Sequence, residues 1–303
     1  MMNWMIDLIL IFLFLFLLIC LWAAVFDSNR FVTVTYDIEA PKLKKDCKIV
    51  FLSDLHNKCY GPENKKLVEA IQKESPDLIL IGGDLLTAKA KNNKKKKKKD
   101  TSGHAIELLS ALQGKYPIYY AYGNHEDRAG RRIDRYGDLW TKYLEAVKDY
   151  PITFLNNQHE TLEEYGLSIY GYTMPWEYYK KFIPRVLPEE EMPMALGKAK
   201  EDTFNILLAH NPEFFPSFRK WNPDLTLAGH VHGGVMRLPF IGGVISPSFR
   251  IFPHYDGGVF QEEGKQMIIS RGLGSHTIPI RIFNPGELVV LQLHSLAKNE
   301  KSL

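Results

Sequence analysis

Side chains that bind divalent metal ions recur at five places in this chain, each directly after a short apolar run. The five segments are Ser53-Asp54-Leu55-His56, Gly82-Gly83-Asp84, Gly123-Asn124-His125-Glu126, Ala209-His210-Asn211-Pro212 and Gly229-His230-Val231-His232. Imidazole and carboxylate ligands without thiolates suit Mn, Fe or Zn. Side chains two residues apart share a face of extended backbone, so Asp54 and His56 can reach one site. Each segment alone is typical of a solvated loop, but five in this order indicate a metal site.

The elements around these segments alternate between apolar runs and amphipathic stretches. Runs at 48–52, 78–81 and 118–122 predict buried strands, and 62–75, 104–113 and 139–149 predict helices. The second half predicts strands at 168–172, 206–209, 225–228, 267–270 and 288–293. We therefore expect an α/β fold in which two sheets pack face to face and are flanked by helices. Ligands gather at the carboxyl ends of strands in such sheets.

The five segments resemble the signature of the calcineurin-like metallophosphoesterases, which runs D-x-H, G-D, G-N-H-E, H and G-H-x-H. The stretches LAHNPE, LAGHVHGGVMRLP and RGLGSHTIPIRIFNPGEL are similar to a membrane-associated branch of that family. This branch includes YkuE-type proteins and the LpxG-type UDP-2,3-diacylglucosamine pyrophosphatases. The resemblance implies a β-sandwich flanked by helices and a centre with two divalent ions. It covers most of the chain beyond residue 30.

The resemblance also implies a role for each residue of the signature. One ion would be held by Asp54, His56 and His232, the other by Asn124, His210 and His230, with Asp84 bridging them. His125 would act as the catalytic residue that protonates the leaving group or stabilises its charge. Protein phosphatases of the family carry G-D-x-x-D-R-G, whereas this chain has Thr87 where the second Asp would stand. This departure favours phosphodiester or pyrophosphate hydrolysis over protein dephosphorylation.

Three further residues in the glycine-rich segment after the last metal motif are candidates for substrate contact. They are Arg271, His276 and Arg281. Surface salt bridging is the alternative for all three, and the sequence leaves both interpretations open.

The amino-terminal end predicts a membrane anchor over residues 1–30. Residues 8–26 are an unbroken apolar run, which as a helix spans roughly 28 Å, the thickness of a bilayer core. The preceding leader has no Lys or Arg, unlike a cleaved signal peptide. Basic residues follow the run, at Arg30, Lys42, Lys44 and Lys45, and favour a cytoplasmic location for the rest of the chain. We expect a connector over 31–46, the catalytic domain over 47–296 and a tail over 297–303.

Charge excludes one class of partner. The net charge of +3 depends on eight lysines between Lys89 and Lys99, within a lysine-rich loop predicted over 88–102. Without that loop the chain would carry more acidic than basic residues, whereas a nucleic-acid binder spreads basic residues over one face. We therefore expect no nucleic-acid partner. The expected partners are a phosphorylated small molecule or lipid as substrate and membrane lipid around the anchor.

A second insertion, over 174–197, is rich in aromatic residues, Met and Pro. It could pack as a satellite core or form an apolar flap that receives the acyl part of a lipid. The sequence thus predicts a membrane-anchored hydrolase of phosphodiester or pyrophosphate bonds. A nucleotide-linked lipid such as UDP-2,3-diacylglucosamine is one candidate substrate. A general phosphodiesterase or phosphatase of the cell envelope, and a non-catalytic membrane-surface binding protein, are the alternatives.

Overall fold

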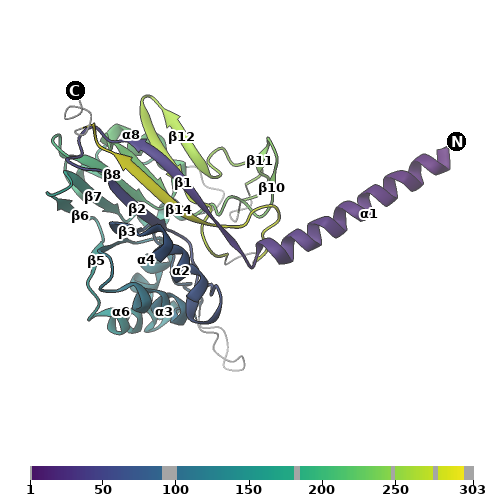
Figure 1. Cartoon of the computed structure of the whole chain (residues 1–303), viewed down its shortest axis with the longest axis horizontal. Helices are drawn as coiled ribbons and strands as arrows, with labels where there is room; N and C mark the ends of the chain where they lie inside the picture. Colours follow the sequence, from purple (N-terminus) through teal and green to yellow (C-terminus); the bar gives the residue numbers. More distant parts are fainter. Residues whose placement is uncertain (1, 91–100, 181–184, 247–249, 276–278, 297–303) are drawn as a thin grey trace.

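Two six-stranded sheets pack face to face, and helices cover both outer faces (Figure 1). The computed structural model describes residues 2–90, 101–180, 185–246, 250–275 and 279–296. Most of the lysine-rich loop, the tail and His276 therefore lie outside the described residues. The predicted mixed α/β fold with two sheets is confirmed.

The first sheet carries the first three metal-ligand segments. Its strand order is β1 (Phe31–Glu39), β14 (Gly286–His294), β2 (Cys47–Leu52), β3 (Leu78–Ile81), β4 (Ile118–Ala121) and β5 (Ile152–Leu155). Strands β2 to β5 run parallel. Ile49 and Phe51 face the second sheet, whereas Val50 and Leu52 face the helices. Burial on both faces is why these strands read as continuous apolar runs.

Helices on the outer face of the first sheet come from the segments between its strands. They are α2 (Lys65–Glu74), preceded by the short helix η1 (Pro62–Asn64), then α3 (Gly103–Leu112), α4 (Asn124–Arg131), α5 (Ile133–Tyr136) and α6 (Leu139–Val147). Leu67, Ile71, Leu108 and Tyr143 pack into one buried cluster with Val50 of the sheet. This packing fixes the positions from which the ligand loops leave the strands.

The second sheet carries the last two metal-ligand segments. Its order is β12 (Gly258–Glu262), β13 (Lys265–Ile269), β9 (Leu225–Ala228), β8 (Phe204–Ala209), β7 (Leu167–Tyr172) and β6 (Gln158–Leu162). The described part of this half of the chain also contains six short elements. They are the helices η2 (Trp176–Tyr179), α7 (Glu191–Leu196), η3 (Pro212–Phe214) and α8 (Phe215–Trp221), and the strand pair β10 (Arg237–Leu238) and β11 (Gly242–Gly243).

Helix α1 (Met2–Asp27) projects away from the two sheets (Figure 1). Residues Trp4–Asp27 have a mean hydropathy of 3.2, so the helix is long and apolar enough to cross a membrane. Its end is fastened to the domain, because Asn284 N donates to Asp27 Oδ2 at 3.1 Å and Arg281 N donates to Ser28 Oγ at 3.0 Å. Asp27 is buried at this junction.

The segment predicted as a connector over 31–46 instead begins with a strand of the domain. Phe31–Glu39 forms β1 and pairs in parallel with β14 along its whole length. Its side chains alternate between more and less exposed positions, as expected of an edge strand with one covered face. The predicted connector therefore contributes a nine-residue strand to the first sheet.

Candidate metal centre

The seven predicted metal ligands follow the carboxyl ends of five strands from both sheets. Asp54 and His56 follow β2, Asp84 follows β3 and Asn124 follows β4; His210 follows β8, and His230 and His232 follow β9. Asp54 and Asp84 are at most 1% exposed. Three groups of these side chains, one of them with His125, have ligand atoms within 4.8 Å of one another. The structure thus brings the sequence-predicted residues to one edge of the sandwich.

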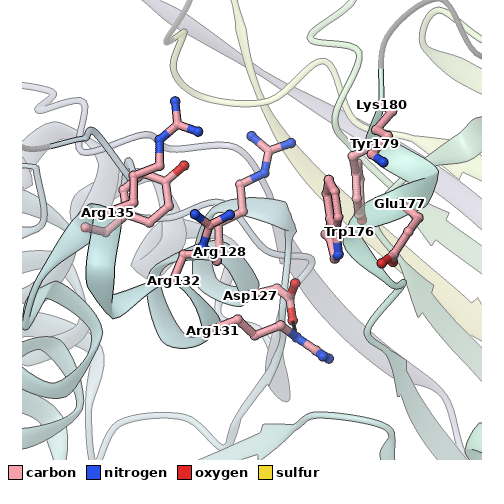
Figure 2. A pocket seen from close by; sticks show the side chains of 10 residues that line it. Asp127, Arg128, Arg131, Arg132, Arg135, Trp176, Glu177, Tyr179 and Lys180 are labelled. Carbon is pink, nitrogen blue, oxygen red and sulfur yellow. Dashed lines mark hydrogen bonds and ion pairs between the residues drawn. The ribbon is translucent and has the colours of Figure 1, made fainter.

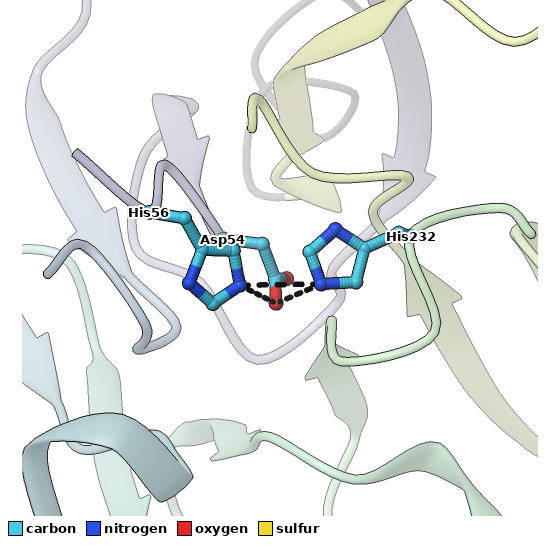
Figure 3. Close-up of side chains that lie close together, drawn as sticks. All are labelled: Asp54, His56 and His232. Atoms are coloured by element: carbon cyan, nitrogen blue, oxygen red, sulfur yellow. Dashed lines mark hydrogen bonds and ion pairs between the residues drawn. The ribbon is translucent and has the colours of Figure 1, made fainter. Parts of the chain in front are cut away.

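Asp54, His56 and His232 form the first group (Figure 3). Asp54 Oδ1 lies 3.6 Å from His56 Nε2 and 3.4 Å from His232 Nε2, and the two imidazole nitrogens are 3.2 Å apart. The other carboxylate oxygen, Oδ2, accepts hydrogen bonds from Ser53 Oγ and from His230 N. One oxygen of Asp54 is therefore held by the protein and the other faces the imidazoles.

Asp84, His210 and His230 form the second group, and Asp84 also lies in a group with His56 and His125. His210 Nε2 is 3.1 Å from Asp84 Oδ2, and His56 Nε2 is 3.8 Å from the same oxygen. Oδ1 of Asp84 accepts from His125 N at 2.7 Å. Asp84 therefore touches both groups, as a bridging carboxylate must.

Backbone carbonyls set the tautomer of two imidazoles. His210 Nδ1 lies 2.7 Å from Gly82 O, and His232 Nδ1 lies 2.9 Å from Gly274 O. A carbonyl only accepts, so each Nδ1 carries a proton and Nε2 is the nitrogen that faces the cluster. Metal-ligating histidines are oriented by hydrogen bonds of this kind.

His125 has the opposite arrangement. Ala88 N donates to its Nδ1 at 2.8 Å, so the proton of the neutral ring is on Nε2. His125 thus presents an N–H donor even when its ring is neutral. Burial lowers the pKa of this imidazole to about 3, against the opposing charge of Asp84. The neutral ring is a proton donor beside the cluster rather than a ligand.

The electrostatics of the cluster fit a positively charged occupant. Burial disfavours the charged form of Asp84, but the imidazole of His210 holds the pKa of this carboxyl well below its usual value. Burial lowers the pKa of His210, yet the carboxylates of Asp84 and Asp54 outweigh it and raise that pKa to about 10. The cluster therefore draws a proton to its centre to balance two anions.

Unpaired buried oxygens point to the same conclusion. Asn124 Oδ1 and Asp54 Oδ1 are buried and accept no hydrogen bond from the described residues. Burying such atoms without a partner costs about 1–3 kcal/mol each, so an occupant that coordinates oxygen is expected. Oxygen and imidazole donors together suit divalent ions such as Mn, Fe or Zn, and these residues fit a two-metal site.

Glu126 is a functional position that the sequence analysis did not assign. Its carboxylate accepts from Asp84 N at 2.8 Å, Leu85 N at 3.0 Å, Gly123 N at 3.0 Å and Tyr120 Oη at 2.8 Å. It therefore ties the loop after β3 to the loop after β4. The available signal was its place in the first turn of a helix, where a glutamate commonly reaches back to the preceding backbone.

Arg281 does not have the free side chain that substrate contact requires. It is 3% exposed, and its donors reach Ser275 Oγ and the carbonyls of His232, Arg271, Gly272, Gly274 and Asn284. These bonds to protein atoms occupy the guanidinium, so the structure gives no support to the predicted substrate contact at Arg281. Instead it braces the loop whose Gly274 carbonyl orients His232.

The other two substrate candidates have different outcomes. Arg271 Nε donates to Glu287 Oε2 at 2.6 Å, and Arg271 N donates to the same oxygen at 3.0 Å. This is the salt bridge that the sequence left open as the alternative. His276 lies outside the described residues.

The insertion over 174–197 packs largely as a satellite core. Met174, Leu187, Met192 and Leu196 are buried in one cluster with Phe218 of α8. The described part therefore supports the packed alternative for these side chains. Trp176, by contrast, is 45% exposed and faces a pocket beside α4.

The two-sheet fold and the buried cluster at its strand ends define a metallophosphoesterase. Residues 47–234 match the family described as calcineurin-like phosphoesterase, and the chain belongs to that family. Its relatives include the uncharacterized metallophosphoesterase Cj0846 of Campylobacter jejuni, 30% identical over 261 residues, which cover 85% of this chain and 62% of that protein. This chain thus spans less than two thirds of the Campylobacter protein.

Two further relatives match over similar lengths. The uncharacterized metallophosphoesterase YkuE of Bacillus subtilis is 28% identical over 254 residues, covering 82% of this chain and 79% of that protein. Phosphodiesterase YaeI of Escherichia coli is 28% identical over 234 residues, covering 75% of each chain. The resemblance inferred from the five motifs is therefore confirmed at the level of the family.

Proposed function

We propose that this protein hydrolyses a phosphodiester or pyrophosphate bond with the help of two divalent metal ions. One observation carries the proposal. Asp84 touches both groups of ligand side chains, while His125 offers an N–H at the same place. Family membership and the phosphodiesterase name of the Escherichia coli relative support the same reaction class.

The residues divide into those that would hold metal and those that would move a proton. Asp54, His56 and His232 would hold one ion, and Asn124, His210 and His230 the other, with Asp84 between them. Two such ions offset the charge of a phosphoryl group and lower the pKa of a water molecule. His125 would donate its Nε2 proton to the departing oxygen, because Ala88 N holds the ring in that tautomer.

Hydrolysis of bis-p-nitrophenyl phosphate with added Mn²⁺ tests this proposal. We expect p-nitrophenolate release that stops on chelation with EDTA and returns when Mn²⁺ is restored, because the carboxylates and imidazoles need the ion to act. Unchanged release in EDTA would contradict a metal-dependent reaction. Metal binding without any turnover of this ester or of a pyrophosphate diester would favour the non-catalytic binding protein.

Membrane anchoring through α1 is part of the same proposal. The helix is long enough to cross a bilayer, and Ile280, next to the contact between Arg281 N and Ser28 Oγ, is exposed. Phe240 and Ile241, between β10 and β11, are also exposed. β10 and β11 lie on the side of the domain from which α1 leaves (Figure 1). A lipid-linked pyrophosphate in the adjoining leaflet is a substrate that this placement would serve, with the basic residues after α1 favouring the cytoplasmic side.

Removing residues 1–27 tests the anchor separately from the chemistry. We expect the shortened protein to leave the membrane fraction after cell lysis, because the apolar helix is gone. The membrane fraction of full-length protein should resist a carbonate wash, as a spanning helix does. Full-length protein that is released by the wash would contradict a spanning anchor. Turnover of the soluble diester serves as the folding control for the shortened form.

A further inference from the structure

A pocket of about 500 Å³ lies beside the metal centre, between the α4–α5 segment and the short helix η2. Figure 2 shows arginine side chains of α4 and α5 on one side, and Trp176, Tyr179 and Lys180 on the other. The charged side chains of the lining also include two acidic ones, Asp127 and Glu177. The pocket is strongly basic although the chain, apart from its lysine-rich loop, is mildly acidic.

Three cations of this pocket have no acidic partner within ion-pair distance among the described residues. Arg131 is paired with Asp127, and Arg132 is paired with Asp134. No such pair involves Arg128, Arg135 or Lys180 in the part of the chain that the structure describes. Arg128 is also half-buried, so its charge is only partly hydrated. An anionic ligand is the occupant that such a group of cations would bind.

The pocket adjoins the metal centre through residues that border both. Arg128 follows Asn124 by four residues on α4, so both side chains lie on one face of the helix, one turn apart. On the opposite wall, the ring of Tyr179 lies 5.1 Å from the ring of His230 and 6.4 Å from that of His210, measured between centroids. A substrate whose phosphoryl group sits at the metal ligands would therefore extend past Tyr179 into this pocket.

An aromatic surface lies opposite the arginines. Trp176 is 45% exposed, and Lys180 Nζ lies 4.2 Å from the centroid of its ring. An exposed indole beside uncompensated cations suits a ligand that is both anionic and planar, since planar rings stack on aromatic side chains.

This inference rests on the proposed function and names its substrate class. We propose that the pocket binds the part of the substrate beyond the scissile bond, with a second phosphate held by Arg128 and Arg135 and a planar ring against Trp176. Guanidinium groups bind phosphate through two parallel hydrogen bonds, which gives orientation as well as affinity. A nucleoside diphosphate joined to a sugar or lipid carries both features, whereas a simple dialkyl phosphate carries neither.

Binding of α,β-methylene-UDP, which cannot be hydrolysed between its phosphates, tests the pocket by calorimetry on the full-length, Mn²⁺-loaded protein in detergent. Wild-type protein should bind this analogue at least about tenfold more tightly than uridine, and Arg128→Gln should weaken the analogue by about 10- to 100-fold, as expected for hydrogen bonds to charged groups. Trp176→Ala should weaken both ligands severalfold. Lys142→Gln removes the same charge from exposed α6 outside the pocket and should change neither affinity.

Two results would overturn the proposal. One is unchanged affinity of Arg128→Gln for the analogue. The other is an equal loss of affinity in Lys142→Gln, which would show that only the long-range effect of charge matters. Tighter binding of dihexanoyl phosphatidic acid than of the analogue would overturn the nucleotide assignment in favour of a lipid phosphate. Binding can be measured without turnover, so the two proposals can fail separately. If the hydrolysis assay fails but this pattern of affinities is observed, the proposed reaction is rejected and the binding role of the pocket is retained.

Discussion

Replacing Asp84 with alanine should empty both metal positions and abolish hydrolysis of phosphate diesters. Asp84 Oδ2 lies 3.1 Å from His210 Nε2 and 3.8 Å from His56 Nε2, so this carboxylate belongs to both ligand groups. Its anionic charge also offsets the repulsion between two divalent cations. We expect the loss of rate to exceed the cost of removing a proton donor, about 10²–10⁴-fold, because Asp84 Oδ2 faces imidazoles of both groups and accepts no hydrogen bond from the described residues.

Metal content by mass spectrometry, alongside the rate of diester hydrolysis, measures this effect. Asp134→Ala is the matched control, because it removes an exposed carboxylate of α5 that pairs only with Arg132 among the described residues. Retention of one full equivalent of metal by Asp84→Ala would show that Asp84 serves one ion and does not bridge. A melting curve of the variant establishes that the protein is still folded.

His125→Ala should keep its metal and lose turnover, by about 10²–10⁴-fold for a leaving group that needs a proton. The reason is the tautomer: Ala88 N occupies Nδ1, so the ring offers a donor and not a lone pair. The loss should be smaller for p-nitrophenolate, which leaves readily without protonation, than for an alkoxide or phosphate leaving group.

The two rates and the metal content together decide the role of His125. His104→Ala, at a partly exposed position paired with Glu107, is the control for removing an imidazole. If His125→Ala loses metal as Asp84→Ala does, the ring is a ligand and the assignment is wrong. An equal loss of rate for good and poor leaving groups would show that His125 does not protonate the leaving group.

The sequence predicted the inner strands of both sheets and missed the edges. Within the two six-stranded sheets, the analysis did not identify β1, β5, β6 and β12, which are the outermost strands. It also missed the short pair β10 and β11. Central strands are buried on both faces and read as continuous apolar runs. Edge strands are partly exposed, and β6 has the sequence QHETL, which carries no apolar pattern. The ligands were predictable because they follow inner strands.

Backbone conformation at the ligands was not accessible from the sequence. Asp54, His56, Asp84, His230 and His232 all have φ between 47° and 68°, the left-handed region that L-residues rarely adopt. Such conformations cost about 1–3 kcal/mol each and persist where the surroundings fix them, commonly at functional sites. The motifs predict which residues meet, whereas the strained turns that aim their side chains follow only from the three-dimensional structure.

The structural roles of Arg281 and Glu126 were not predicted, for a related reason. Both are charged residues that the fold buries against backbone groups of the ligand loops. A charged residue near a metal motif suggests substrate contact, because residue type alone cannot distinguish a side chain that points to solvent from one that braces a loop. The distinction depends on the positions of carbonyl and amide groups far away in sequence.

The position of β14 has a consequence for the biosynthesis of this protein. β14 is the last strand of the described residues, yet it lies between β1 and β2 and pairs with both. The first sheet therefore cannot close until the ribosome has made residue 294, long after β2 to β5 have emerged. Such long-range pairing slows folding, and until β14 arrives the open edge of β2 can pair with other chains. Nascent chains that stall before β14 should therefore be the aggregation-prone species.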